Sequence, residues 1–382
     1  MGSVISAEQH SLSVTAIGPD LYAGSAGIAL ALGECASVTG SDSQRLTAIG
    51  GLNRSCARFD ESPQASIGLY GGAVGVGFAA RRLSKLGIIS NQDGLLLRTY
   101  ERIEAGLKQR YLLDITGGIA GTLLFLVTEW KDEPSSIVSS LIERCAEALC
   151  DAALWTEDKC AWSARDATGL EFMKPLGGYS HGAAGIAGAL LNAYAVTGSQ
   201  RLLDTARGAL AYDDSLFVES EQNWRDARFD GGGPDVGQGA FPVAWCHGAG
   251  GIALSRVTAA RVDHIRADRY LRAADIAYRT TKSFLDRILS LDRYDCTLCH
   301  GIAGLADILF ICGPALQGRA YDGRDVQEYI DKRLSSGVRL PSGLPSGRYH
   351  PSLFLGEAGI AIQVLRLGRN GETPSVLDIC AA

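Results

Sequence analysis

The sequence lacks any long apolar run. Its longest stretches of this kind, such as Gly118–Val127, are shorter than the roughly 18 residues that suggest a membrane-spanning helix. The N-terminus also lacks the charged start and apolar segment that are typical of a secretory signal peptide. These absences predict a cytoplasmic protein with no membrane span. In that reducing environment the ten cysteines do not indicate a disulfide framework.

Basic residues are not in excess. The 36 lysines and arginines are outnumbered by 42 acidic residues, which gives a net charge of -6. Because binding to nucleic acid depends on a surplus of positive charge, nucleic acid is not an expected partner. Only seven of the basic residues are lysines, a bias compatible with a GC-rich bacterial genome. The hydrophobic share of 46% is that of an ordinary soluble protein.

A motif built on Gly-x-x-Gly occurs seven times along the chain. Its first glycine stands at Gly24, Gly72, Gly118, Gly182, Gly248, Gly301 and Gly356. The copies lie 46 to 66 residues apart, which leaves room for two helices and their loops in each repeat. We therefore interpret residues 1–382 as a single domain made of seven repeats.

Each copy predicts a turn followed by a buried inner helix. Glycine permits close approaches that a Cβ atom would forbid, and the residues after it are small and apolar. The segments between copies have charged faces and apolar residues at helical spacing, for example Arg98–Leu113, Ser135–Leu154 and Arg269–Leu289. These segments predict outer helices with one solvated side. No run of alternating residues predicts a strand.

Seven inner and seven outer helices predict a closed, all-α ring. An open solenoid requires polar repeats at its ends, and the sequence shows none. The predicted fold class is therefore a seven-fold α/α toroid, in which the residues before each motif gather around a central cavity. The two longest intervals contain loops rich in aromatic, charged and glycine residues, at 156–179 and 219–245, and such loops usually serve function.

Three of the six histidines occupy the same place in the repeat. His181, His247 and His300 each stand directly before a Gly-x-x-Gly motif, and two of them follow a cysteine, Cys246 and Cys299. Two thiols and up to three imidazoles at one end of a ring predict a transition-metal site, most plausibly for Zn²⁺. The spacing leaves two ligand sets open, since either His247 or His300 could join the cysteines. Each set leaves a fourth position for water or substrate, as in catalytic zinc sites.

The remaining cysteines have other interpretations. Cys296–His300 matches the Cys-x-x-Cys-His motif of c-type haem attachment, which would require export, and the repeat already accounts for Cys299 and His300. A redox pair, or Cys296 as an additional metal ligand, stays open. Most of the others are interpreted as small apolar core residues, namely Cys35, Cys56, Cys145, Cys150, Cys312 and Cys380.

Asp114 lies near the start of the third inner helix. An aspartate at that place commonly caps the free amides of a helix N-terminus. Its predicted position at the same end of the ring as the histidines also allows a catalytic role.

The stretches GGYSHGAAGIAGALL, AWCHGAGGIALSR and LCHGIAGLADILF resemble the lanthionine synthetase cyclases, the LanC-like family. The resemblance extends from LYAGSAGIALAL to PSLFLGEAGIAIQVLRL, and it is nearest to the C-terminal cyclase part of the bifunctional LanM synthetases. The family is a seven-fold α/α toroid around a zinc site. By resemblance the zinc ligands are Cys246, Cys299 and His300, and the acid/base residues are His181 and Asp114.

Three departures from the family pattern have consequences. Pro242 stands where the family has an arginine, so either another arginine such as Arg225 or Arg228 supplies the cation or the step works without one. His247 stands where stand-alone cyclases often carry tyrosine, and we place it among the catalytic residues without an assigned step. The large dehydratase region of LanM enzymes is missing, so the resemblance implies either a separate dehydratase protein or an absent N-terminal dehydratase domain.

The resemblance implies a reaction. A cysteine thiol of a dehydrated precursor peptide, made of a leader and a Ser/Thr/Cys-rich core, adds to a dehydroalanine or dehydrobutyrine of the same peptide and forms a thioether ring. Two alternatives remain at this point. One is a LanC-like transferase that adds glutathione or another thiol to dehydrated residues, and the other is a non-catalytic, zinc-containing scaffold that binds the peptide.

Overall fold

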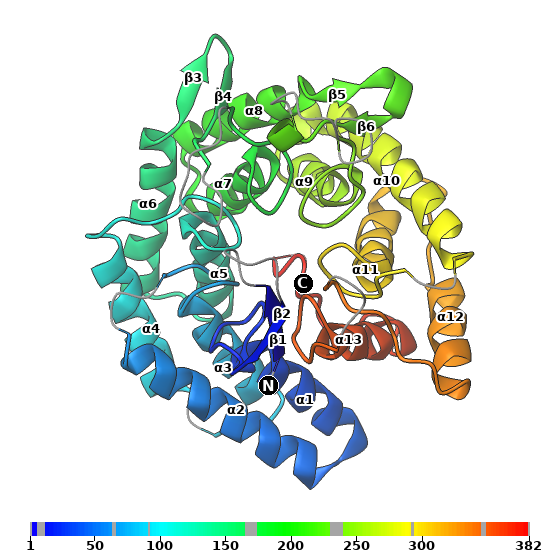
Figure 1. The fold of residues 1–382 in the computed structure, drawn as a ribbon. Coiled ribbons are helices and arrows are strands. Elements are labelled where there is room, and N and C mark those ends of the chain that lie inside the picture. Colours follow the sequence, from blue (N-terminus) through cyan, green and yellow to red (C-terminus); the bar gives the residue numbers. More distant parts are fainter. Residues whose placement is uncertain are drawn as a thin grey trace.

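The computed structural model describes residues 2–5, 12–62, 66–90, 92–164, 174–229, 240–291, 294–344 and 349–380. Within these ranges the chain forms thirteen α-helices and three two-stranded antiparallel sheets. Figure 1 shows the helices as two concentric rings. None of the helices in these ranges has the length and apolar character needed to cross a membrane.

The inner ring consists of helices that begin at the Gly-x-x-Gly motifs. In the described ranges these helices are α1 (Ser25–Thr39), α3 (Val74–Lys85), α5 (Ile119–Asp132), α7 (Ala183–Thr197), α9 (Ala249–Val262), α11 (Ile302–Cys312) and α13 (Glu357–Gly368). Each packs against the next, and α13 packs against α1, so that the ring is closed. The predicted seven-fold α/α toroid is confirmed.

The outer ring has six helices in the described ranges, α2 (Asp42–Asp60), α4 (Asp93–Gly106), α6 (Ser136–Asp151), α8 (Gln200–Asp214), α10 (Ala267–Leu289) and α12 (Arg324–Ser335). The prediction of a seventh outer helix was wrong. After α13 the described chain forms no further helix and instead enters the centre of the ring (Figure 1). There Tyr70 Oη donates to the Val376 carbonyl (2.7 Å) and Trp245 Nε1 to that of Leu377 (3.2 Å), and the tail buries its apolar side chains.

Three short hairpins also depart from the predicted all-helical pattern. They are β1 (Gly2–Ile5) with β2 (Leu12–Thr15), β3 (Leu154–Thr156) with β4 (Lys159–Ala161), and β5 (Phe217–Val218) with β6 (Asn223–Trp224). Strands of two to four residues are too short to show an alternating pattern in the sequence. The last two hairpins lie in the two long intervals, whose segments 165–173 and 230–239 are outside the described residues.

Close backbone contacts explain the repeated glycines. A Cβ atom on the second glycine of each motif would lie 1.8 to 2.3 Å from the carbonyl oxygen six residues earlier. Gly248 has a φ of 75°, and a Cβ there would lie 1.7 Å from the Pro242 carbonyl oxygen. The predicted close approach at these glycines is confirmed.

Backbone hydrogen bonds join the turns before the inner helices into a second closed ring. The carbonyl oxygen of the residue two places before each motif accepts a hydrogen bond from one or two backbone N–H groups of the preceding repeat, at 2.9 to 3.2 Å. The residues concerned are Tyr22, Tyr70, Thr116, Ser180, Cys246, Cys299 and Phe354. The last junction runs from the Phe354 N–H to the Tyr22 carbonyl (3.0 Å). This ring holds all seven turns in register, so the cysteine and histidine positions share one end of the toroid.

Candidate functional site

The two cysteines of the repeat motif meet at this end of the ring. Cys299 is buried and Cys246 half-buried. A hydrogen bond between the two sulfurs is the largest influence on the pKa of Cys246 and lowers it. Burial opposes this effect, and the charges of His300 and Arg228 lower the pKa further. The pair therefore carries negative charge on one sulfur readily, as a cation-binding thiol pair must.

His300 lies beside the thiols, with its Nε2 atom 3.3 Å from Asp295 Oδ2. Its imidazole contributes to the charge around Cys246 but does not complete a cluster. In the part of the chain that the structure describes, no three His, Cys, Asp or Glu side chains gather closely enough to hold a metal ion. The structure thus brings two of the three predicted ligands together and leaves the third next to them.

Tyr22 also reaches the thiol pair, and sequence reasoning missed it. Its hydroxyl donates a hydrogen bond to Cys299 Sγ at 2.9 Å, and its ring stacks on Phe354 with centroids 4.8 Å apart. A signal was available in the sequence, because Tyr22 and both cysteines occupy the position two residues before a Gly-x-x-Gly motif.

Asp114 and His181 form a second pair. His181 Nδ1 lies 2.7 Å from Asp114 Oδ2, while Asp114 Oδ1 accepts the Gly117 N–H at 2.8 Å. The interpretation of Asp114 as the helix N-cap was wrong, because the N-cap of α5 is Gly118 and Asp114 instead caps the turn before it. Its contact with His181 is compatible with the acid/base role, which stays a prediction. If Nδ1 donates to Asp114, His181 Nε2 is the proton-accepting atom. The His181 side chain is 41% exposed, so this atom can exchange protons with a substrate.

His247 has different surroundings. It is 3% exposed, its Nδ1 lies 3.7 Å from Asp226 Oδ2, and its ring stacks on that of His181 with centroids 5.9 Å apart. Burial, and next the charge of Arg228, lower the pKa of His247 to about 3. Its imidazole is therefore neutral near pH 7, and it supports the His181 ring from one side.

Arg228 provides a cation close to the thiols. It lies in the 3-10 helix Ala227–Phe229 and binds Asp226, with Nε 3.0 Å from Oδ1. Burial lowers the pKa of Arg228, but Asp226 and the charges of Cys246 and Cys299 raise it overall. Arg225, by contrast, lies over the ring of Phe241 at 6.0 Å. Of the two arginines considered as substitutes for the one missing at Pro242, Arg228 is the one that acts on the cysteines.

The open volume beside the site lies off the axis of the ring. The axis itself is filled by Tyr70, Trp245 and Phe354, whose ring centroids are 4.9 to 5.4 Å apart, so the expected central cavity is occupied by aromatic rings. A cavity of about 960 Å³ opens instead from His300 and Asp295 toward α10. Its wall includes Phe241, Pro242, Val243, Ala244, Ile276, Arg279, Thr280, Ser283, Phe284, Arg287 and Tyr294.

Cys296 faces away from this group. Its thiol donates to the Tyr294 carbonyl at 3.5 Å, and burial raises its pKa to about 12. All ten cysteines are free thiols, so Cys296 and Cys299 form no disulfide. A thiol that is buried and hard to deprotonate behaves as a core residue rather than as a metal ligand.

Comparisons with known proteins give one family match and several structural matches. The family model described as lanthionine synthetase C-like protein matches residues 15–378. The solved structure of nisin cyclase is 16% identical with a TM-score of 0.66, and the match covers 96% of this chain and 93% of that chain. An unsaturated glucuronyl hydrolase from Bacillus sp. GL1 is 12% identical with a TM-score of 0.43, covering 97% and 91% of the two chains. No curated protein sequence matches the chain.

Proposed function

Because the chain belongs to the lanthionine synthetase C-like family, we propose that it is a zinc-dependent lanthipeptide cyclase. In the proposed reaction a cysteine thiol of a dehydrated precursor peptide adds to a dehydroalanine or dehydrobutyrine of the same peptide, which forms a (methyl)lanthionine ring. The observation that carries the proposal is the pair of neighbouring thiols, Cys246 and Cys299, which influence each other's pKa, at the same end of the toroid as the His181–Asp114 pair.

Cys246, Cys299 and His300 would hold the Zn²⁺ ion. Thiolate and imidazole are the donors that zinc prefers, and a site with three protein ligands leaves room for a substrate atom. His300 Nε2 lies near Asp295, which leaves Nδ1 as the ring nitrogen for the metal. A carboxylate next to the other nitrogen of a metal-bound histidine fixes the orientation of the imidazole ring. When bound, zinc would supply a cation that deprotonates the substrate thiol, whose free pKa is about 8.5.

His181 and Asp114 would move the proton. The new S–Cβ bond forms as the Cα–Cβ double bond of the dehydro residue opens, and the proton lost by the thiol must finally reach Cα. His181 Nε2 can receive and return that proton, while Asp114 holds Nδ1 at 2.7 Å and fixes the ring. His247 keeps the His181 ring in place through their stacking contact.

The surroundings would stabilise negative charge that develops on the peptide during the addition. The inner helices present their N-terminal ends at this face, and such ends favour anions. Arg228 adds a full positive charge near both cysteines. The cavity of about 960 Å³ that opens at His300 is large enough for a peptide segment beside the site. A separate dehydratase, or a dehydratase domain outside this chain, would prepare the peptide.

The test is incubation of the purified protein with a precursor peptide that already contains dehydro residues, with and without glutathione. Ring closure leaves the peptide mass unchanged but removes thiols that react with an alkylating reagent, whereas thiol transfer adds the mass of glutathione. Cys299→Ala should lose both zinc and ring closure, and His181→Asn should keep zinc and lose ring closure. Cys35 lies on α1 and outside the thiol pair, so Cys35→Ala should change neither zinc content nor ring closure.

Four outcomes would contradict the proposal. Purified protein without stoichiometric zinc would contradict the proposed metal site. Full zinc retention in Cys246→Ala would show that the proposed ligand set is wrong. Bound peptide and bound zinc without any ring closure would favour the scaffold. A mass increase in place of ring closure would favour the thiol transferase.

A further inference from the structure

The contact between Tyr22 and Cys299 is a direct link between two residues 277 positions apart. Tyr22 belongs to the first repeat and Cys299 to the sixth, and the seventh repeat bridges them through Phe354. The Phe354 N–H donates to the Tyr22 carbonyl (3.0 Å), and the Cys299 N–H donates to the Phe354 carbonyl (3.1 Å). Backbone hydrogen bonds on both sides of Phe354 therefore fix the Tyr22 hydroxyl at the Cys299 sulfur.

The repeat provides an internal comparison. Tyr70 occupies the same position in the second repeat, and its ring also packs against Phe354, with centroids 4.9 Å apart. Its hydroxyl, however, donates to the Val376 carbonyl at 2.7 Å. The two tyrosines at equivalent positions thus have different contacts. Tyr70 binds the C-terminal segment at Val376, and Tyr22 contacts a predicted zinc ligand.

The Tyr22 hydroxyl donates to Cys299 Sγ at 2.9 Å, and a hydrogen bond to an ionised acceptor, such as a metal-bound thiolate, is stronger than one between neutral groups. With two cysteine ligands and an added substrate thiolate, a Zn²⁺ site would carry one net negative charge. A neutral donor aimed at one of those sulfurs offsets part of that charge and holds the sulfur in one orientation.

We propose that Tyr22 is a positioning residue of the metal centre, whose hydroxyl holds the Cys299 sulfur and stabilises it as a zinc ligand. The inference rests on the proposed zinc site, and it assigns a role to a residue of the first repeat, which supplies none of the predicted ligands. Tyr22 acts through Cys299 and need not touch the substrate.

The experiment compares Tyr22→Phe with Tyr70→Phe in the full chain, loaded with Co²⁺ in place of Zn²⁺. Removing a hydrogen bond from a thiolate raises the energy of its electrons, so the sulfur-to-cobalt charge-transfer band of Tyr22→Phe should move to longer wavelength. Its zinc affinity, measured by competition with a chelator, should fall about 10-fold. Tyr70→Phe removes an equivalent hydroxyl from the same aromatic cluster and should change neither the band nor the affinity.

Replacement of Tyr22 by a fluorinated tyrosine is a second test, and it keeps the aromatic ring and the hydroxyl in place. Its more acidic hydroxyl is a stronger donor, so the band should move to shorter wavelength. An unchanged band and affinity in Tyr22→Phe, or equal shifts in both phenylalanine variants, would overturn the role of Tyr22. A wild-type protein that binds neither metal would instead overturn the proposed zinc site, so the two failures are distinguishable.

Discussion

At the scale of single residues, Asp114 uses its two carboxylate oxygens for different contacts. Oδ1 accepts the Gly117 N–H and Oδ2 contacts His181 Nδ1. In Asp114→Asn the amide keeps an oxygen for Gly117 but presents an NH₂ group to His181, which places the imidazole proton on Nε2. We expect ring closure to slow by about 10²- to 10⁴-fold, the usual contribution of a general acid or base. Turnover of a dehydrated peptide measures this directly.

Zinc content and thermal unfolding of the same variant provide the control, because neither depends on the tautomer of His181. Both should equal those of the wild type. A normal rate in Asp114→Asn would place the acid/base function on another group. Loss of zinc would mean that Asp114 supports the metal centre instead.

The site residues differ in how far the sequence could reveal them. Cys246, Cys299 and the three histidines repeat at fixed offsets from a glycine motif, so their shared location follows from the repeat alone. Arg228 has no counterpart in other repeats, and it reaches the thiols through the 3-10 helix in a long interval. The repeat position of Tyr22 could place it at the same end of the ring as the cysteines, but its contact with Cys299 depends on ring closure and was not predictable from the motifs.

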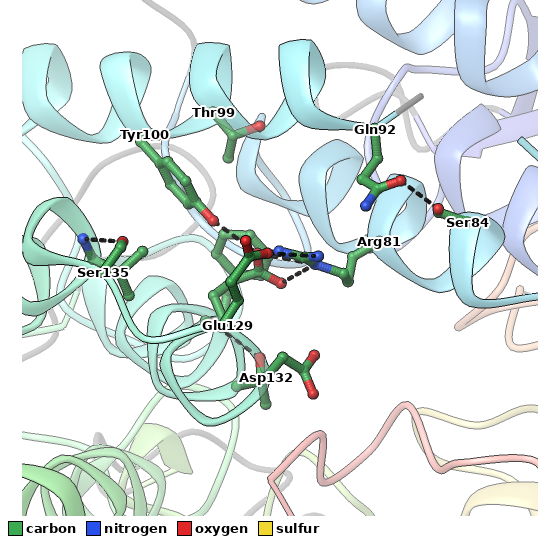
Figure 2. A network of polar contacts seen from close by, with 12 residues as sticks. Arg81, Ser84, Gln92, Thr99, Tyr100, Glu129, Asp132 and Ser135 are labelled. Atoms are coloured by element: carbon green, nitrogen blue, oxygen red, sulfur yellow. Dashed lines mark hydrogen bonds and ion pairs between the residues drawn. The ribbon is translucent and has the colours of Figure 1, made fainter. Parts of the chain in front are cut away.

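At the scale of elements, a buried ionic network joins α3, α4 and α5 (Figure 2). Arg81 Nη2 lies 2.7 Å from Glu129 Oε2, and Tyr100 Oη donates to the same carboxylate at 2.8 Å. Glu129 is 2% exposed. Loss of Glu129 would leave the Arg81 guanidinium with the exposed Glu133 carboxylate, at 3.6 Å, as a weaker partner, so we expect Glu129→Leu to lower the free energy of unfolding by about 3 kcal/mol. Urea denaturation would measure it.

The double variant Arg81→Leu/Glu129→Leu tests the cause, because it removes both charges together. It should recover part of the stability lost by Glu129→Leu. The exposed pair Arg58–Glu61 (2.8 Å) is a matched control, and Glu61→Gln should change stability by less than about 1 kcal/mol. A double variant less stable than Glu129→Leu would mean that the network acts through packing and not through charge.

Helices whose apolar residues recur every three or four positions could be predicted from the sequence. The short strands and the exact ends of the helices could not. The segment Arg98–Leu113 does contain a helix, but α4 runs from Asp93 to Gly106, because its apolar face and its end are set by contacts with α3 and α6. The missing seventh outer helix has a similar cause. The residues after α13 bury Val376 and Leu377 in the ring centre, and the local sequence does not show that destination.

At the scale of the whole molecule, the candidate site exists only if the ring closes. Its residues come from five repeats, with Tyr22 in the first, Asp114 in the third, His181 in the fourth, Cys246 in the fifth and Cys299 in the sixth. Each junction between repeats uses backbone hydrogen bonds of 2.9 to 3.2 Å, including the one that joins the seventh repeat to the first. Damage at the junction of the seventh and first repeats should therefore reach the thiols.

Gly27 allows a test of that dependence. It lies on α1 at the closing junction, where a Cβ would lie 2.1 Å from the Leu21 carbonyl oxygen and 2.7 Å from Leu353 Cβ. Gly27→Ala must push α1 away from the seventh repeat and with it the Tyr22 hydroxyl from Cys299. We expect a lower unfolding temperature and weaker zinc binding, although residue 27 contacts no predicted ligand.

Gly50→Ala on α2 is the matched control, because a Cβ there meets no atom within 4 Å. Alanine inside a helix lowers the entropy of the unfolded chain, so this variant should be more stable by about 0.5–1 kcal/mol with unchanged zinc affinity. Circular dichroism melting and zinc titration of both variants separate the two effects. Wild-type zinc affinity in a folded Gly27→Ala protein would show that the metal centre forms without a tight closing junction.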